Sequence, residues 1–198
     1  MISRFKDYDT IKGYSDIERL PKGGYICKIL SVEKCSGSNG EYLKISLDIA
    51  DGEYKDYFMN EWKQRKQSNE DAKWSCNFLL NLPKDDGSER DGWTKRHFKT
   101  FTNALEDSNT GYHFDWDETK FKGKLIGGLF NEREWESRQD HTVRRSINFA
   151  RPTTVENIRT GNYKIPDDKL LNLVKPIPGL PSGFVEVPDG IEDELPFT

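Results

Sequence analysis

One stretch of strict alternation constrains the fold of this chain more than any other feature. Residues 43–49 read Leu-Lys-Ile-Ser-Leu-Asp-Ile, and a period of two is typical of a strand with one face buried and the other in solvent. Asp51-Gly52, a hairpin-turn dipeptide, follows directly. The pattern predicts a central strand of an antiparallel sheet, with Tyr42 and Lys44 on its outward face.

Shorter apolar patterns on both sides of this strand predict the other elements. Runs rich in β-branched and aromatic residues indicate strands, and apolar residues at three- and four-residue spacing indicate helices. The expected strands are residues 24–32, 43–49, 54–60, 124–133 and 144–151, and the expected helices are residues 71–82, 95–107 and 154–159.

Three strands, a helical insertion and two more strands is the element order of the OB-fold, a five-stranded Greek-key barrel. An open antiparallel sheet with a helix produces the same order. We expect a mainly β OB-fold domain over residues 21–165, preceded by an N-terminal extension over residues 1–20. Residues 166–198 are rich in Pro and Gly towards their end, which predicts a flexible, disordered acidic tail because little apolar area is available for burial.

Acidic residues are concentrated in this tail. The whole chain has a net charge of -4, but residues 176–198 hold five acidic residues and no Lys or Arg. The preceding residues are therefore close to neutral. A near-neutral body can still carry a local basic surface, so the charge does not exclude nucleic acid as a partner.

The sequence also indicates the cellular compartment of the protein. No apolar run approaches the roughly 18 residues of a membrane span, and the N-terminus lacks the apolar region of a secretory signal. The three cysteines are too scattered for a disulfide framework. We expect a protein of the reducing cytoplasm without membrane association.

Catalytic signals in the sequence are weak. Glu53 and Lys55 match an acid-x-Lys pattern with Asp48 and Asp51 nearby, and metal-dependent nucleases need clustered carboxylates. In a chain with 32% charged residues this short pattern arises easily by chance. Cysteine and histidine spacings also do not match a zinc site. We predict a protein that is not an enzyme and needs no cofactor or metal.

Aromatic residues interleaved with cations form the strongest functional signal. Exposed rings stack on bases, at about 1–3 kcal/mol per base, and cations follow the phosphates. A duplex hides the faces of its bases, so the pattern favours single strands. The candidate contacts are Tyr42, Lys44, Trp62, Lys63, Arg65, Lys66, Trp93, Lys95, Arg96, Trp135, Arg144 and Arg145.

The C-terminus carries a second functional signal. It ends in Asp193-Glu194-Leu195-Pro196-Phe197, followed by Thr198. Acidic residues are steered to a basic pocket rim, and Pro-Phe can fill an apolar pocket. The order of these residues predicts a linear motif that docks on a partner protein.

These residues resemble those of a known family. The ending resembles the acidic tip of bacterial and phage single-stranded DNA-binding proteins, although Thr198 follows the Phe that usually ends that tip. Residues 20–60, with Leu20-Pro21 and the segment 40–45, are similar to small OB-fold proteins of phage and prophage replication modules. The resemblance implies a protein that coats single strands, often as a homo-oligomer, and recruits replication or recombination proteins through its tip.

We therefore expect sequence-tolerant binding of single-stranded DNA in phage or bacterial DNA replication or recombination. Two alternatives stay open at this point. One is a metal-dependent phage nuclease using Glu53 and Lys55, and the other is a protein-interaction adaptor on an OB-like barrel.

Overall fold

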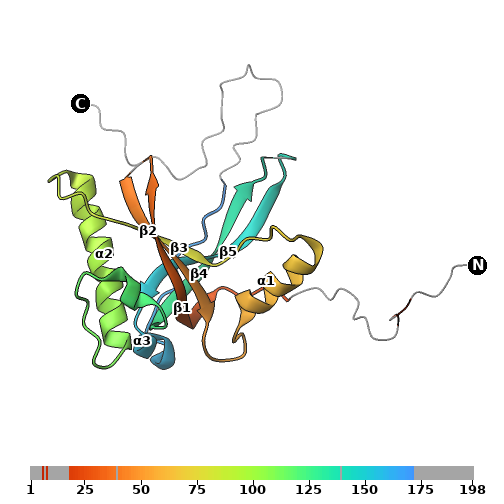
Figure 1. The fold of residues 1–198 in the computed structure, drawn as a ribbon, viewed down its shortest axis with the longest axis horizontal. Coiled ribbons are helices and arrows are strands. Elements are labelled where there is room, and N and C mark those ends of the chain that lie inside the picture. The colour runs from red at the N-terminus through yellow and green to blue at the C-terminus, as the bar shows by residue number, and fades with distance from the viewer. Residues whose placement is uncertain (1–5, 7, 9–17, 39, 139, 172–198) are drawn as a thin grey trace, which may run out of the picture.

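The structure is a computed structural model that describes residues 6, 8, 18–38, 40–138 and 140–171. Most of the predicted N-terminal extension lies outside these residues, as do the chain from 172 onward and the predicted docking tip. The elements, labelled in Figure 1, are β1 (Gly23–Gly37), β2 (Gly40–Ile49), α1 (Tyr57–Ser68), β3 (Asn77–Asn81), α2 (Glu89–Ser108), the 3-10 helix η1 (Glu118–Phe121), β4 (Leu125–Glu136), β5 (Val143–Thr153) and α3 (Val155–Thr160).

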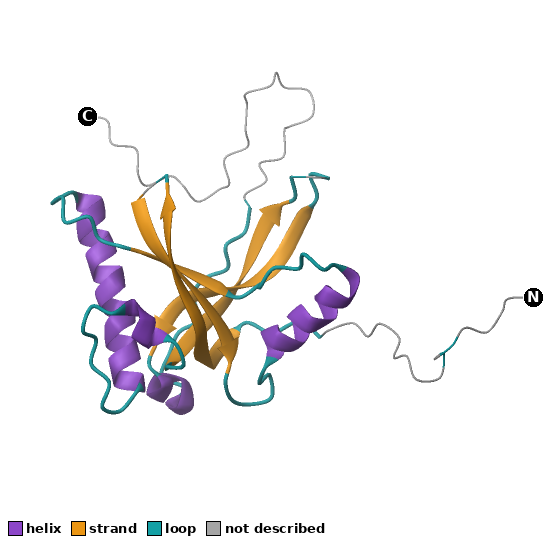
Figure 2. Cartoon of the chain, viewed as in Figure 1, coloured by secondary structure: helices purple, strands orange, loops and turns teal. Residues whose placement is uncertain are grey.

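The fold is mainly β, built on one five-stranded antiparallel sheet in the order β3-β2-β1-β4-β5. The long strand β1 pairs with β4 over Gly23–Lys28 and with β2 over Cys27–Gly37, and its register with β2 shifts between Ile29 and Ser31. The β1–β2 and β4–β5 hairpins project in the same direction (Figure 2). Helices α2 and α1 lie on opposite sides of the sheet in this view.

The alternating segment is the centre of the core, as predicted. Leu43, Ile45, Leu47 and Ile49 are all buried, with at most 2% of each side chain exposed. They belong to the same apolar cluster as the buried side chains of α2, including Phe101. A helix over 95–107 and strands near 124–133 and 144–151 are also confirmed, as α2, β4 and β5. The short helix expected after residue 154 is α3, whose first turn is capped by the Thr154 side chain.

Two predicted elements are wrong. Residues 54–60 do not return as a strand but form a turn and the start of α1, and residues 71–82 are a loop followed by β3. Tryptophans hold this arrangement: the Trp74 indole donates a hydrogen bond to Leu47 O at 3.1 Å, and the Trp62 indole donates to Ala72 O at 2.9 Å. The third strand of the sheet is therefore supplied from further along the chain.

Asp48 explains why a helix starts where a strand was expected. Its carboxylate, which is 4% exposed, accepts backbone hydrogen bonds from Ile49, Phe58 and Met59 at 2.8, 3.0 and 3.1 Å. The last two are among the N–H groups that a helix leaves unpaired at its N-terminus. Burial raises the pKa of this carboxyl group, while its backbone hydrogen bonds lower it. Asp48 thus fixes the first turn of α1 against β2.

The described chain continues past residue 165 along β4. Lys169 N donates to Glu132 O at 2.8 Å, and Glu134 N donates to Lys169 O at 2.9 Å. Asp168 forms an ion pair with Lys22 at 2.9 Å. These contacts occupy the edge of β4 beyond the point where its pairing with β1 ends.

We predict that Asp48→Ala lowers the free energy of unfolding by about 2–4 kcal/mol, because it leaves buried N–H groups of α1 without an acceptor. Urea unfolding followed by circular dichroism measures this change. Asp51→Ala is the matched control, since Asp51 is exposed and, within the described part of the chain, accepts only the Gly52 N–H at 2.9 Å. Equal losses in both variants would contradict the anchoring role of Asp48.

Candidate nucleic-acid interface

The outer side of α2 carries an exposed aromatic ring among cations. Trp93 is 48% exposed, and its ring centroid lies 3.8 Å from that of His97. Arg90 and Arg96 are three residues before and after Trp93, so they lie on the same side of the helix. Burial lowers the pKa of His97, and Arg151 of β5 and Arg96 lower it further. Arg151 therefore lies close enough to extend this side of α2 onto β5.

No described carboxylate neutralises the charge of the arginines on this side of α2. Arg90, Arg96 and Arg151 form no ion pair with another residue in the part of the chain that the structure describes. Lys95, on the same helix, differs from them. Its ammonium is paired with Asp91 at 2.8 Å and with Asp85, and these hydrogen bonds raise the pKa of Lys95. Lys95 was predicted to contact nucleic acid, but its charge is already neutralised within the protein.

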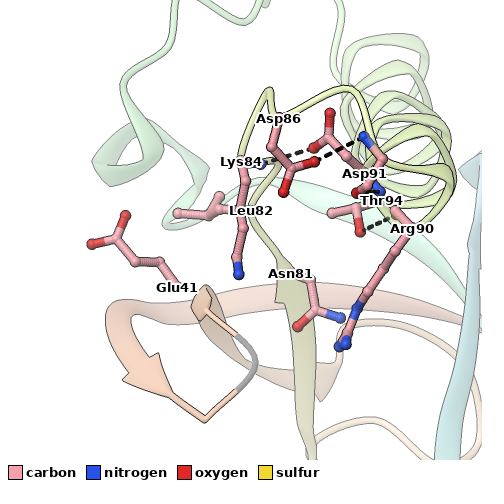
Figure 3. Close-up of a pocket in the computed structure, with 9 residues that line it drawn as sticks. Glu41, Asn81, Leu82, Lys84, Asp86, Arg90, Asp91 and Thr94 are labelled. Carbon is pink, nitrogen blue, oxygen red and sulfur yellow. Dashed lines mark hydrogen bonds between the residues drawn. The ribbon is translucent and has the colours of Figure 1, made fainter.

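A small pocket lies between the first turn of α2 and strands β2 and β3 (Figure 3). Lys84 and Arg90 extend from opposite walls towards Asn81 of β3. The buried carboxylate of Asp91 organises the loop, since one oxygen accepts the N–H groups of Lys84 and Asp85 at 2.9 and 3.1 Å. This contact places the Lys84 side chain beside the first turn of α2.

The outward face of β2 and β3 continues from this pocket. The register places Tyr42 opposite Asn81 and Lys44 opposite Leu79, so these side chains share one face. Leu79 is 56% exposed, while Tyr42 and Lys44 are partly exposed. Lys44 lies 3.7 Å from Glu33. We call the set that runs from this face to α2 and β5 the α2 surface, made of Tyr42, Lys44, Asn81, Lys84, Arg90, Trp93, Arg96, His97 and Arg151.

The predicted residues of α1 are engaged in packing. Trp62 is half-buried, with its ring centroid 6.2 Å from that of Trp74, and the Lys66 ammonium lies 4.9 Å from the Trp62 ring. Arg65 lies 3.4 Å from Glu61, and Lys63 is exposed. Among the described residues, no hydrogen bond, ion pair or ring contact joins these side chains to the α2 surface, and the Trp62 indole N–H is already bound to the protein backbone.

Trp135, Arg144 and Arg145 lie on the β4–β5 hairpin. Trp135 lies beyond residue 133, where the predicted strand ends, but it belongs to β4, where it pairs with Arg144 and is 39% exposed. Arg144 is paired with Asp140 and Arg145 with Glu134, both at 2.7 Å. Neighbouring carboxylates therefore largely neutralise the charges of these two arginines.

Five residues of the α2 surface are not among the predicted contacts: Asn81, Lys84, Arg90, His97 and Arg151. Arg90 and His97 stand three residues before and four after Trp93, so helical spacing around that residue was the signal that would have found them. Lys84 and Arg151 join the surface only through the packing of a loop and a distant strand, for which the sequence contains no local signal.

Trp116 provides a contrasting case. It is the most exposed of the large hydrophobic residues described, at 81%, and its ring stacks on Phe98 with centroids 6.2 Å apart. Acidic residues surround it in sequence, and Lys120 pairs with Asp115 and Asp117. Exposure alone therefore does not mark a surface suited to phosphate.

The carboxylates proposed for a nuclease are not gathered into a metal site. Asp48 accepts three backbone N–H groups in a buried position, whereas Glu53 and Lys55 are exposed. Within residues 18–171, apart from the undescribed positions 39 and 139, no three His, Cys, Asp or Glu side chains lie close enough to hold a metal ion.

No protein-family model and no curated protein matches the chain. Among the described residues, no helix is both long and apolar enough to cross a membrane.

We predict that the fluorescence of Trp93 falls as His97 becomes protonated, with a midpoint below the ordinary value of 6.5. The difference in emission between the native chain and Trp93→Phe reports this step, and His97→Gln should abolish it. Since the unfolded chain binds this proton more tightly than the folded one, the free energy of unfolding should also fall as the pH drops through this range. A transition that persists in His97→Gln would contradict the stacked geometry.

Proposed function

We propose that the protein binds single-stranded DNA across the α2 surface, without marked sequence preference. The observation that carries the proposal is the half-exposed Trp93 ring flanked by arginines that have no described ionic partner. A base stacked on such a ring contributes about 1–3 kcal/mol, and unpaired guanidinium groups neutralise phosphates. Stacking and phosphate contact do not depend on base identity, which supports sequence-tolerant binding.

The arrangement suggests a path for the strand. Tyr42 and Asn81 are neighbours on the outward face of the sheet, and Asn81 lines the same pocket as Arg90. Trp93 follows one helical turn later. A single strand would run from the sheet, past the first turn of α2, towards Arg151 on β5. A duplex would keep its base faces hidden from Tyr42 and Trp93.

The fold itself is proposed to be an OB-type barrel. Its two edge strands, β3 and β5, approach each other through Phe78 and Phe149, whose ring centroids are 5.0 Å apart. Helix α2 lies between β3 and β4 in the chain, as in that fold. OB-folds bind oligonucleotides on the face of strands 2 and 3, which is where Tyr42 and Lys44 lie.

The wider role follows from the resemblance. We propose a protein that is not an enzyme, acts in the cytoplasm of a bacterial host during DNA replication or recombination, and forms homo-oligomers. Residues 193–197 would recruit replication proteins. This tip lies outside the described residues, so its role is supported by its sequence alone.

We predict that Trp93→Ala weakens the binding of a dT oligonucleotide by about 5- to 150-fold, because one stacked base is lost. Arg96→Ala should reduce the slope of log affinity against log salt by about 0.7, the value for one phosphate contact on a single strand. Fluorescence anisotropy at several salt concentrations measures both effects.

Trp116→Ala is the matched control, since it removes a more exposed indole from an acidic setting and should leave the affinity unchanged. Equal effects of Trp93→Ala and Trp116→Ala would contradict the proposed surface. Failure of the native protein to bind oligonucleotides at low salt would favour the adaptor alternative. Cleavage of labelled DNA on addition of Mg²⁺ or Mn²⁺ would favour the nuclease.

We predict that deleting residues 189–198 leaves the affinity for single strands unchanged or slightly raised, because the deletion removes acidic residues that compete with phosphate. The same anisotropy titration compares the two chains. A large loss of affinity would show that these residues contribute to DNA binding, which contradicts a role confined to partner docking.

A further inference from the structure

A second concave surface lies apart from the α2 surface. It is an open groove of about 590 Å³, formed by the first turns of α1, the chain entering β3 and the outer halves of β4 and β5. It shares no lining residue with the α2 surface. The residues that matter for its chemistry are Arg19, Tyr57, Arg133, Trp135, Ser146 and Asn148.

The groove exists because β5 extends beyond its contact with β3. Phe149 packs on Phe78, but residues 143–148 continue outwards along β4, and α1 lies across from them. Arg19 is held against this part of β5 by a 2.7 Å hydrogen bond from its guanidinium to Arg145 O. The Tyr57 hydroxyl accepts the Leu20 N–H at 3.1 Å. Both walls of the groove are therefore held by specific contacts.

One face of the β4–β5 hairpin supplies the functional groups. Arg133 pairs with Ser146 and Trp135 with Arg144, while Asn148 pairs with Asn131, so all of these residues share that face. Trp135 and Arg133 are two residues apart, or about 7 Å along the strand. This separation is close to the span from a base to the phosphate of the same nucleotide.

The groove has an excess of available positive charge. Glu61 is engaged by Ser75 Oγ at 2.5 Å and by Arg65 at 3.4 Å, and Arg145 is engaged by Glu134. Arg19 and Arg133 form no ion pair with another described residue. No described carboxylate neutralises either charge, and Arg19 keeps further N–H donors besides the one bound to Arg145 O, so both guanidinium groups can bind an anion. A guanidinium fork matches the geometry of phosphate.

The polar groups beside the rings are also free. Neither Ser146 nor Asn148 forms a side-chain hydrogen bond with another described residue. An amide offers both donors and an acceptor, and a hydroxyl offers one of each kind. An aromatic ring, an amide and two guanidinium groups without a described ion pair together match the ring face, the edge and the phosphate of a nucleotide.

We propose that this groove binds one nucleotide through its base and its phosphate. Trp135 and Tyr57 contact the base, Asn148 bonds to its edge, and Arg133 and Arg19 bind the phosphate. The ligand is a nucleoside monophosphate unit, supplied either free in solution or as the phosphorylated end of a strand. The proposal depends on the groove alone, so it stands or falls separately from binding at the α2 surface.

Isothermal titration of the full chain with dTMP and with 5′-phosphorylated (dT)4 tests the proposal. We expect binding of at least one of these probes, and we expect Arg133→Ala to weaken it by about tenfold or more, the usual effect of losing a charged hydrogen bond. Arg159→Ala is the matched control, because Arg159 is exposed on α3, away from the groove, and its loss should have no effect.

The arms of the experiment separate the two sources of ligand. Binding of dTMP supports a free nucleotide, whereas binding of phosphorylated (dT)4 alone supports a strand end. Absence of binding by both probes would overturn the proposal, as would equal affinity for inorganic phosphate and dTMP. Loss of long-oligonucleotide binding in Trp93→Ala, with dTMP binding retained, would support two separate sites. If the native chain binds dTMP but no long strand, the α2 proposal fails and the groove proposal stands.

Discussion

Asp48 ties strand β2 to the first turn of α1 through two helix N–H groups, and the position of α1 and of the strand beside β2 depends on that contact. With α1 anchored there, residues 57–68 cannot pair with β2, and the strand beside β2 comes instead from Asn77–Asn81. The same anchor places Tyr57 at the wall of the groove. One buried carboxylate therefore joins β2 to α1 and holds one wall of the groove in place.

The surfaces of this protein differ in whether their cations are already paired with carboxylates, more than in how many cations they carry. Lys95 and Arg145 lie in positions that looked suitable for phosphate, but each is bound by carboxylates within the fold. Arg90, Arg96 and Arg133 have no such partner among the described residues. A surface ion pair contributes little to stability, yet it removes a cation from the set that can bind an anionic ligand.

The sequence correctly predicted those segments in which apolar residues repeat at strand or helix spacing, because such a repeat places them on one face. The alternation over 43–49 and the helical spacing of Phe98, Phe101 and Leu105 were interpreted correctly, because each pattern has one apolar face that must be buried. Residues 54–60 were interpreted wrongly. Their aromatic residues are typical of a strand. The group that accepts the first N–H groups of the helix is the Asp48 carboxylate, which lies in β2.

The sequence by itself determined a mainly β chain with a buried central strand, a long amphipathic helix and an aromatic, cation-rich composition. The tertiary structure alone decided which aromatic residues stay accessible and which cations stay unpaired. Trp62 packs on Trp74 while Trp93 remains half-exposed, although both stand beside basic residues in the sequence. The physical reason is that accessibility and ion pairing depend on residues distant in the chain, such as Asp85 for Lys95, and no local pattern records those neighbours.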